Sequence, residues 1–152
     1  MKSKADNFEA IEAGLAALKQ SMFQHRAWEN LQKRAGISMD RSSATLLKVV
    51  MHCGNNPCRM QDIAQKLGVE APSVTRTVQE LEAAGMVKRL PDESDRRASN
   101  ITLTKKGQQQ LAKMQKARKE LLSEVLAEWT PQDQKQFAVL LQRFADELLK
   151  TH

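Results

Sequence analysis

Apolar residues recur at spacings of three and four along the first part of the chain. This spacing predicts one long amphipathic helix that Gly36 ends. Asp6 and, three residues later, Glu9 resemble a capping box at its start. The stripe has no neighbour in sequence that could cover it, so we expect another surface to do so. Its members are Phe8, Ile11, Leu15, Leu18, Met22 and His25, with Leu31 further on.

The middle of the chain alternates helical patterns with breaks. Residues 41–53 are apolar on most sides, as in a buried helix, and residues 54–57 break the pattern. Two shorter helices are predicted at 60–67 and 72–84, separated by a turn at Gly68 and Val69 and stopped by Gly85. Extended pieces at 86–90 and 100–103 bracket a charged loop. This order predicts a helix-turn-helix followed by a β-hairpin wing, a DNA-binding unit.

The last third of the chain predicts two helices. Thr104 is the expected N-cap of a helix that ends near Trp129. Thr130 and Pro131, with Asp133 at the third helical position, form a strong start for the final helix. Both helices carry apolar stripes: Leu111, Met114, Leu121, Val125 and Leu126 on the first, and Phe137, Leu140, Leu141, Phe144 and Leu148 on the second.

The predicted fold is therefore mainly α with a small β-hairpin wing. We expect a winged helix-turn-helix lobe at 37–103, flanked by dimerisation helices at 1–36 and 104–152, in one intertwined domain. Two-fold pairing would cover the terminal stripes and double the DNA contacts of a single lobe; the alternative is a plain bundle within one chain. The residues expected to make the dimer contact are Phe8, Ile11, Leu15, Leu18, Phe137, Leu141, Phe144 and Leu148.

Composition favours some classes of binding partner and disfavours others. With 152 residues and a formal net charge of +6, the chain favours an anionic partner. Tyrosine is absent, which disfavours stacking on single strands. No apolar run is long enough to span a membrane, so we expect a cytoplasmic protein without a membrane partner. Glycine-rich phosphate loops and hydrolase or metalloprotease motifs are missing from the sequence, so we predict no enzyme activity and no cofactor.

The helix at 72–84 carries the expected base-reading face. Arg76 is its one long cation, and arginine can give guanine a bidentate pair of hydrogen bonds in the major groove. Ser73 and Thr75, behind Pro72 at the helix start, are short donors suited to phosphate or base edges. Gln79 could read adenine. The alternative for Arg76 is a solvated surface arginine.

The expected wing tip places an acid beside two guanidiniums. Asp95 can hold one arginine rigid while Arg96 or Arg97 points into a narrow minor groove. The alternative is a solvated hairpin tip with an exposed salt bridge.

Several of these motifs together resemble the MarR family of bacterial winged-helix regulators. The string Glu70-Ala71-Pro72-Ser73, followed by Arg76-Thr77, looks like its SlyA branch. Arg59, Met60 and Glu70 depart from the family pattern, which often has Ser or Thr caps there. The matching strings are Asp62-Ile63-Ala64, Leu67-Gly68-Val69, Val74-Thr75-Arg76, Leu81-Glu82, Gly85-Met86-Val87, Arg89, Asp95-Arg96-Arg97-Ala98 and Leu103-Thr104-Lys105-Lys106-Gly107.

The resemblance implies an obligate homodimer that reads a pseudo-palindrome in double-stranded DNA. Its recognition helices would enter successive major grooves and its wings the flanking minor grooves. The base-reading arginine would be Arg76 and the wing arginine Arg97, supported by Asp95. Such proteins usually repress transcription, sometimes activate it, and many release DNA when a small phenolic or aromatic acid binds between the dimer helices and the winged-helix lobe.

Two groups of residues leave alternatives open. His25, Arg26 and Trp28 could line an effector pocket, although His25 could simply continue the packed stripe and Trp28 fill a dimer seam. Cys53 and Cys58, near His52, lack a zinc spacing, and we expect two free thiols and no metal. Redox sensing, with Arg59 as the only local cation, is an alternative for the cysteines.

Two alternatives concern the protein as a whole. They are sequence-blind architectural DNA binding and a role in protein contacts.

Overall fold

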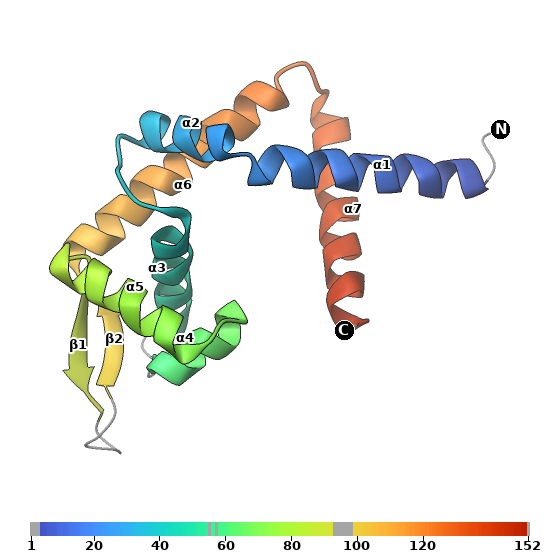
Figure 1. The fold of residues 1–152 in the computed structure, drawn as a ribbon. Coiled ribbons are helices and arrows are strands. Elements are labelled where there is room, and N and C mark those ends of the chain that lie inside the picture. Colours follow the sequence, from blue (N-terminus) through green and yellow to red (C-terminus); the bar gives the residue numbers. More distant parts are fainter. Residues whose placement is uncertain (1–3, 55, 57, 93–98, 152) are drawn as a thin grey trace. The chain divides into compact units, whose positions relative to one another are not determined.

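The computed structural model of the chain describes residues 4–54, 56, 58–92 and 99–151. It divides into a unit of residues Met1–Ala117 and a unit of residues Arg118–His152. The predicted fold class is confirmed, because the described elements are helices and one two-stranded hairpin (Figure 1). In chain order they are α1 Lys4–Phe23, α2 His25–Ala35, α3 Arg41–Cys53, α4 Met60–Leu67, α5 Ala71–Ala83, β1 Val87–Pro91, β2 Ser99–Leu103, α6 Lys105–Val125 and α7 Pro131–Lys150.

The prediction of one long N-terminal helix was wrong, because the chain breaks at Gln24. That residue has an extended backbone (φ −62°, ψ 137°) and precedes α2. Trp28 and Leu31 of α2 are buried, whereas α1 has only exposed side chains among those described, so the two helices bury different amounts of their apolar faces. Asp6 lies inside the first turn of α1 and is not its cap. Gly36 ends α2 in a left-handed conformation (φ 62°), as predicted.

Helix α3 forms the centre of the core of the first unit. Asp40 caps it by accepting a 2.9 Å hydrogen bond from the Ser43 backbone N–H, which satisfies an otherwise orphan donor. Leu46 and Leu47 of α3 are fully buried and belong to one cluster with Ile63 of α4 and Val78 of α5. Burial of these side chains fixes the helix-turn-helix against α3.

The turn between α4 and α5 relies on a left-handed glycine. Gly68 (φ 64°) follows α4, and the Val69 N–H donates to the Ala64 carbonyl at 3.1 Å; a residue with a Cβ would be strained there. The unusual caps are as expected from the sequence. Glu70 makes no side-chain cap for α5, and at α4 the Arg59 backbone N–H donates to the Asp62 carboxylate at 3.1 Å.

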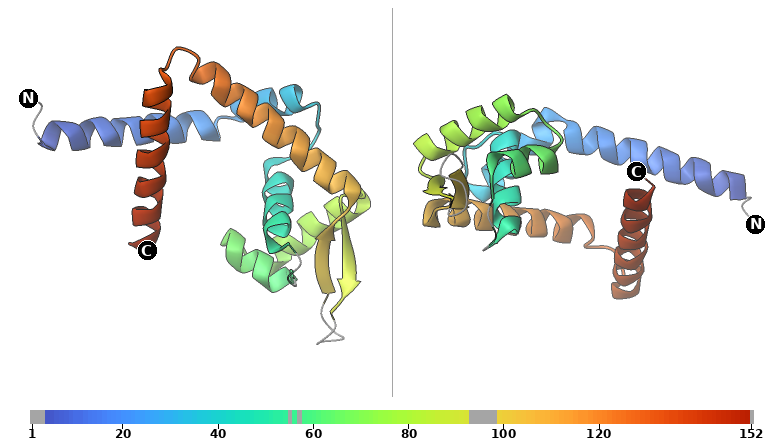
Figure 2. Two further views of the ribbon diagram at one scale, coloured as in Figure 1. Left: turned by 180° about the vertical axis from the view of Figure 1, so that it is seen from behind. Right: turned by 90° about the horizontal axis from the view of Figure 1, so that it is seen from below.

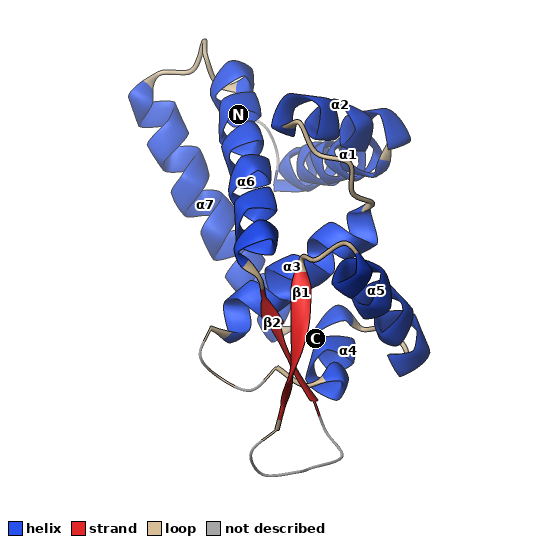
Figure 3. Cartoon of the chain, turned by 90° about the vertical axis from the view of Figure 1, so that its left-hand side faces the viewer, coloured by secondary structure: helices blue, strands red, loops and turns tan. Residues whose placement is uncertain are grey.

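The wing is an antiparallel hairpin (Figures 2 and 3). In its register Val87 pairs with Leu103 and Arg89 with Ile101. Strand β1 is shifted by one residue from the predicted range, and β2 starts one residue earlier than predicted and ends at Leu103 as predicted. Arg59, just before α4, adds an isolated bridge to Asn100 of β2. Val87 and Ile101 are buried, so the base of the wing belongs to the core of the first unit.

Helix α6 starts at a close backbone contact. Gly107 lies so near the Met86 carbonyl that a Cβ atom would clash with it. Thr104 caps the helix as predicted, because its hydroxyl accepts a 3.1 Å hydrogen bond from the Gly107 N–H. Leu111, Met114 and Ala117 are buried, whereas Leu121 and Val125 are exposed. The helix ends at Val125 rather than near Trp129.

In the second unit, Thr130 caps α7 and accepts a 3.1 Å hydrogen bond from the Asp133 N–H, as predicted. Trp129 packs edge-on against Phe137, with 5.3 Å between ring centroids. None of the described helices is both long and apolar enough to cross a bilayer.

Candidate nucleic-acid interface

Helix α5 presents the side chains that the sequence assigned to DNA reading. Val74, Val78 and Leu81 are buried and fix one face of the helix against the core. On the other face Pro72, Ser73, Arg76 and Gln79 are exposed. Thr75 is half-buried and its hydroxyl donates to the Ala71 carbonyl at 3.0 Å. Packing therefore orients the exposed face, and Ser73 is the better placed hydroxyl donor for a phosphate.

Arg76 has an acidic neighbour that the sequence reasoning missed. Its Nε donates to Glu80 Oε1 at 3.0 Å, with 83% of the arginine side chain and 52% of the glutamate exposed. The spacing of four residues on a helix was the available signal. Such an exposed pair is weak, so Glu80 can position the guanidinium while leaving it able to exchange partners.

At the wing, the predicted tip residues Asp95, Arg96 and Arg97 lie outside the described residues. Two ion pairs hold the described part of the hairpin. Arg59 Nε lies 2.7 Å from Asp92 Oδ2, and the Asp92 side chain is only 3% exposed. Arg89 of β1 pairs with Glu82 of α5 at 3.1 Å. The hairpin is thereby tied to both helices of the helix-turn-helix.

The apolar residues predicted to pair two chains are all exposed. On α1 they are 42% to 61% exposed, and on α7 40% to 49%. The set comprises Phe8, Ile11, Leu15 and Leu18 on α1 and Phe137, Leu141, Phe144 and Leu148 on α7.

A cavity of about 620 Å³ lies in the first unit. Two of the three effector candidates line it and the third does not. His25 and Trp28 line it together with Asp40, Arg41 and Glu80. Arg26 is exposed and is not among the lining residues. His25 is also exposed and pairs with Glu29 at 3.3 Å, so it does not continue a packed stripe.

Trp28 does not fill a dimer seam. It is buried in the core of its own chain, and its indole N–H donates to the Met39 carbonyl at 3.1 Å. The Arg41 guanidinium lies 5.5 Å from the ring centroid, a cation–π distance. Aromatic packing and a buried N–H donor explain this placement.

Asp40 gives the cavity a fixed negative charge. Burial acts to raise the pKa of its carboxyl, but hydrogen bonds from the Ser43 hydroxyl and the Ser43 and Ser42 backbone N–H groups outweigh burial and lower the pKa below its ordinary value. The carboxylate therefore stays ionised at neutral pH.

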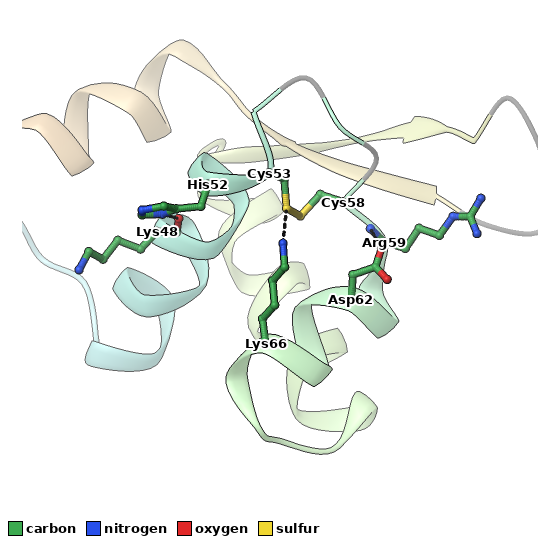
Figure 4. Close-up of a disulfide and its surroundings, with 7 residues drawn as sticks. All are labelled: Lys48, His52, Cys53, Cys58, Arg59, Asp62 and Lys66. Atoms are coloured by element: carbon green, nitrogen blue, oxygen red, sulfur yellow. Dashed lines mark hydrogen bonds between the residues drawn. A yellow bond between two sulfur atoms is a disulfide. The ribbon is translucent and has the colours of Figure 1, made fainter. Parts of the chain in front are cut away.

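The expectation of two free thiols was wrong, because Cys53 and Cys58 form a disulfide (Figure 4). Their Cα atoms are 5.8 Å apart, within the usual range for a bridge. The pairing was not visible in the sequence, because it depends on how α3 ends and α4 begins. Arg59 is also not the only local cation, because Lys66 Nζ lies 3.6 Å from Cys53 Sγ.

Three helices followed by a hairpin, with a polar exposed face on the third helix, define a winged helix-turn-helix protein. The family model described as MarR family matches residues 47–98. A curated relative, the uncharacterized HTH-type transcriptional regulator YxaD of Bacillus subtilis, is 36% identical over 112 residues, which cover 74% of this chain and 76% of the relative. The chain therefore belongs to the MarR family of DNA-binding transcriptional regulators.

Solved structures agree with this fold. The YusO protein of Bacillus subtilis matches with a TM-score of 0.69 and 21% identity over 95% of this chain and 99% of that one. The S. aureus MepR-DNA complex matches with a TM-score of 0.62 and 18% identity over 90% of this chain and 96% of that one.

Proposed function

We propose that this protein is a homodimer that binds a pseudo-palindromic operator through α5 and the wing, and that it represses transcription. The exposed α5 face, with Arg76 at its centre, is the observation that carries the proposal. The MepR complex supports it, because a protein of the same fold was solved with DNA. A regulator with a chromosomal target works in the cytoplasm.

In this proposal Arg76 reads guanine in the major groove. Its guanidinium leaves Glu80 and donates to the O6 and N7 atoms of the base. Gln79 reads adenine, and Ser73, next to Pro72 at the helix start, donates to a phosphate. Thr75 contributes less, because its hydroxyl is already used within the helix.

The wing supplies the minor-groove contact. Arg97, supported by Asp95, enters the groove next to each half-site, and Arg96 contacts the backbone. Arg97→Ala should weaken specific binding by about 1 to 3 kcal/mol while the dimer persists. Fluorescence anisotropy with a labelled operator measures the loss, and an unchanged affinity would remove Arg97 from the site.

The exposed stripes on α1 and α7 support the dimer. Apolar side chains this large and this numerous on two helices form patches that proteins usually cover with a partner. A second copy of the chain would cover these apolar patches, and two-fold pairing would also give two recognition helices for one operator. The likeness to the SlyA branch belongs to the proposal and rests on Glu70 to Ser73 and on Arg76 and Thr77.

The decisive experiment is selection of bound sequences from a random duplex pool. The parent should enrich a two-fold site with half-sites roughly one helical turn apart, and Arg76→Ala should lose it. Arg143→Ala is a matched control, because Arg143 also pairs with an acid four residues on, at the same 3.0 Å distance, but on α7. The control should keep the site. DNA binding without any enriched motif would favour the sequence-blind alternative instead.

We further propose that an aromatic ligand acts through the cavity beside Trp28. A carboxylate on such a ligand would pair with Arg41, while Asp40 and Glu80 would disfavour additional negative charge. Titration of salicylate against Trp28 fluorescence, in a Trp129→Phe background, tests this. Quenching that is absent after Arg41→Gln supports it, and equal quenching in both proteins contradicts it.

A further inference from the structure

The disulfide closes the connection between α3 and α4, the first helix of the helix-turn-helix. Cys53 is the last residue of α3, and Cys58 stands two residues before α4 begins. Both residues are buried, with 4% and 2% of their surface exposed. The bond therefore fixes where α3 ends relative to the segment that leads into α4.

That segment also touches the wing. The Cys58 carbonyl accepts a hydrogen bond of 2.9 Å from the Ile101 N–H, and Arg59 bridges to Asn100, so residues 58 and 59 lie along β2 like the start of a third strand. The Arg59 side chain then reaches Asp92 at the end of β1. A change at Cys58 is therefore passed to both strands of the hairpin.

One cation is aimed at the sulfur atoms. Figure 4 shows Lys66 extending from α4 toward Cys53, while Arg59 points away from the bridge and Lys48 and His52 lie on another side of α3. The His52 ring is occupied with the Lys48 carbonyl at 2.7 Å. After reduction, an ammonium at the 3.6 Å distance of Lys66 would stabilise the Cys53 thiolate, which is the reactive form of cysteine.

We propose that Cys53 and Cys58 are a reversible thiol–disulfide switch that sets how firmly the lobe holds operator DNA. This inference rests on the proposed function. In the disulfide form the end of α3 is tied to residues 58 and 59, which contact β2 and lead into α4. This form is the tighter binder, because less of the lobe remains to be ordered on the DNA. The dithiol form keeps the fold but loosens this tie. We expect about a fivefold difference in affinity, at the lower end of typical coupling between sites.

The switch runs by thiol–disulfide exchange with a low-molecular-weight disulfide. The Cys53 thiolate attacks one sulfur of that disulfide, forming a mixed disulfide and releasing one small thiolate. The Cys58 thiolate then attacks Cys53 Sγ, closing the protein bridge and releasing the second small thiolate. The protein loses two electrons and two protons, and the small disulfide gains them as two thiols. Reduction is the reverse, and burial means that it needs local opening of the lobe.

The first test concerns the thiols alone. The full chain is equilibrated in buffers of reduced and oxidised glutathione, and free thiols are counted by alkylation and mass spectrometry. We expect two thiols to appear and disappear together within the range of these buffers. A bridge that persists across the whole range in the folded protein, yet opens once the protein is unfolded, would be a permanent staple and would overturn the switch.

The second test concerns Lys66. In the reduced protein, Lys66→Gln should slow alkylation of Cys53, whereas the matched variant Lys48→Gln, which removes a lysine pointing elsewhere, should not. Equal rates in all three proteins would mean that Lys66 does not activate the thiol, which removes the assigned chemistry. Circular dichroism confirms that the variants fold.

The third test links the bridge to DNA. Operator affinity is measured for the oxidised and reduced parent and for the Cys53→Ala/Cys58→Ala double variant, each in both buffers. The parent should bind more tightly when oxidised, and the double variant should bind equally in both. Equal affinity of the two parent states contradicts the switch. If neither state binds any selected sequence, the proposed function fails, while the thiol counts still report on the chemistry.

Discussion

The lobe, which runs from α3 to β2, buries its large apolar side chains, whereas α1 and α7 leave theirs exposed. In the lobe, Leu46, Ile63 and Val78 are fully buried, and the hairpin base joins the same core. On α1 and α7, side chains as large as Phe8 and Phe144 stay exposed. Burial of a large apolar side chain contributes about 1.5 to 3 kcal/mol, so the lobe contains its own stabilisation. The apolar side chains of α1 and α7 gain little from burial within one chain, which is why we propose that a second copy covers them.

The largest expected effect is on the proposed dimer contact of α7. Phe144→Glu places a charge on the exposed α7 face and should weaken the dimer by about 3 kcal/mol, roughly a hundredfold in its dissociation constant. Analytical ultracentrifugation measures the change. Gln136→Glu, at an exposed polar position of the same helix, is the control and should leave the dimer intact. A Phe144→Glu variant that sediments like the parent would refute the proposed interface.

The next effect compares two glycines, Gly107 at the start of α6, which contacts the lobe at Met86, and Gly14 in α1. Gly107→Ala should destabilise the fold by about 2 to 3 kcal/mol, because the new Cβ meets the Met86 carbonyl and backbone must shift. Gly14→Ala in α1 meets nothing within 4 Å and should instead stabilise the helix by up to about 1 kcal/mol. Urea unfolding of both variants gives the two values. Destabilisation by Gly14→Ala would indicate that a second copy packs closely against α1.

A smaller effect is expected at the start of α3. Asp40→Ala removes an N-cap and should cost about 1 kcal/mol of stability at neutral pH. Because the folded-state pKa of Asp40 is lowered, its contribution is present above the ordinary value of 3.8 and is lost as the pH falls through the lower, folded value. Denaturation at pH 7 and pH 3 measures this. A gap between parent and variant that fails to narrow at pH 3 contradicts it.

The smallest effect concerns the α5 surface alone. Glu80→Gln weakens the pairing with Arg76 and should change operator affinity by about 0.5 kcal/mol, a little over twofold, without altering the dimer or the stability. Anisotropy titrations resolve a change of this size. A loss as large as that of Arg76→Ala would mean that Glu80 contacts DNA itself.

Sequence patterns located the lobe well because its signals are local. Helices α3 and α4 begin and end at the predicted residues, since glycines and caps mark their ends. The break at Gln24 has no proline or glycine to announce it and depends on which face of α2 is buried. The Cys53–Cys58 bridge and the burial of Trp28 depend on tertiary packing, which one sequence does not display. Glu80 was visible at helical spacing. The base-reading and dimer roles stay predictions.

The corner at Thr104 has a consequence for how such a regulator can diversify. Its hydroxyl donates to the Gly85 carbonyl at 2.6 Å and accepts from the Gly107 N–H, and its own N–H donates to the Met86 carbonyl at 3.0 Å. The start of the hairpin and the start of α6 are thereby anchored directly to each other. Surface loops tolerate insertions when the elements they join are held independently. The loop between β1 and β2 can therefore change in length and sequence without loss of this anchor, and under the proposed function such changes would alter which operators are recognised.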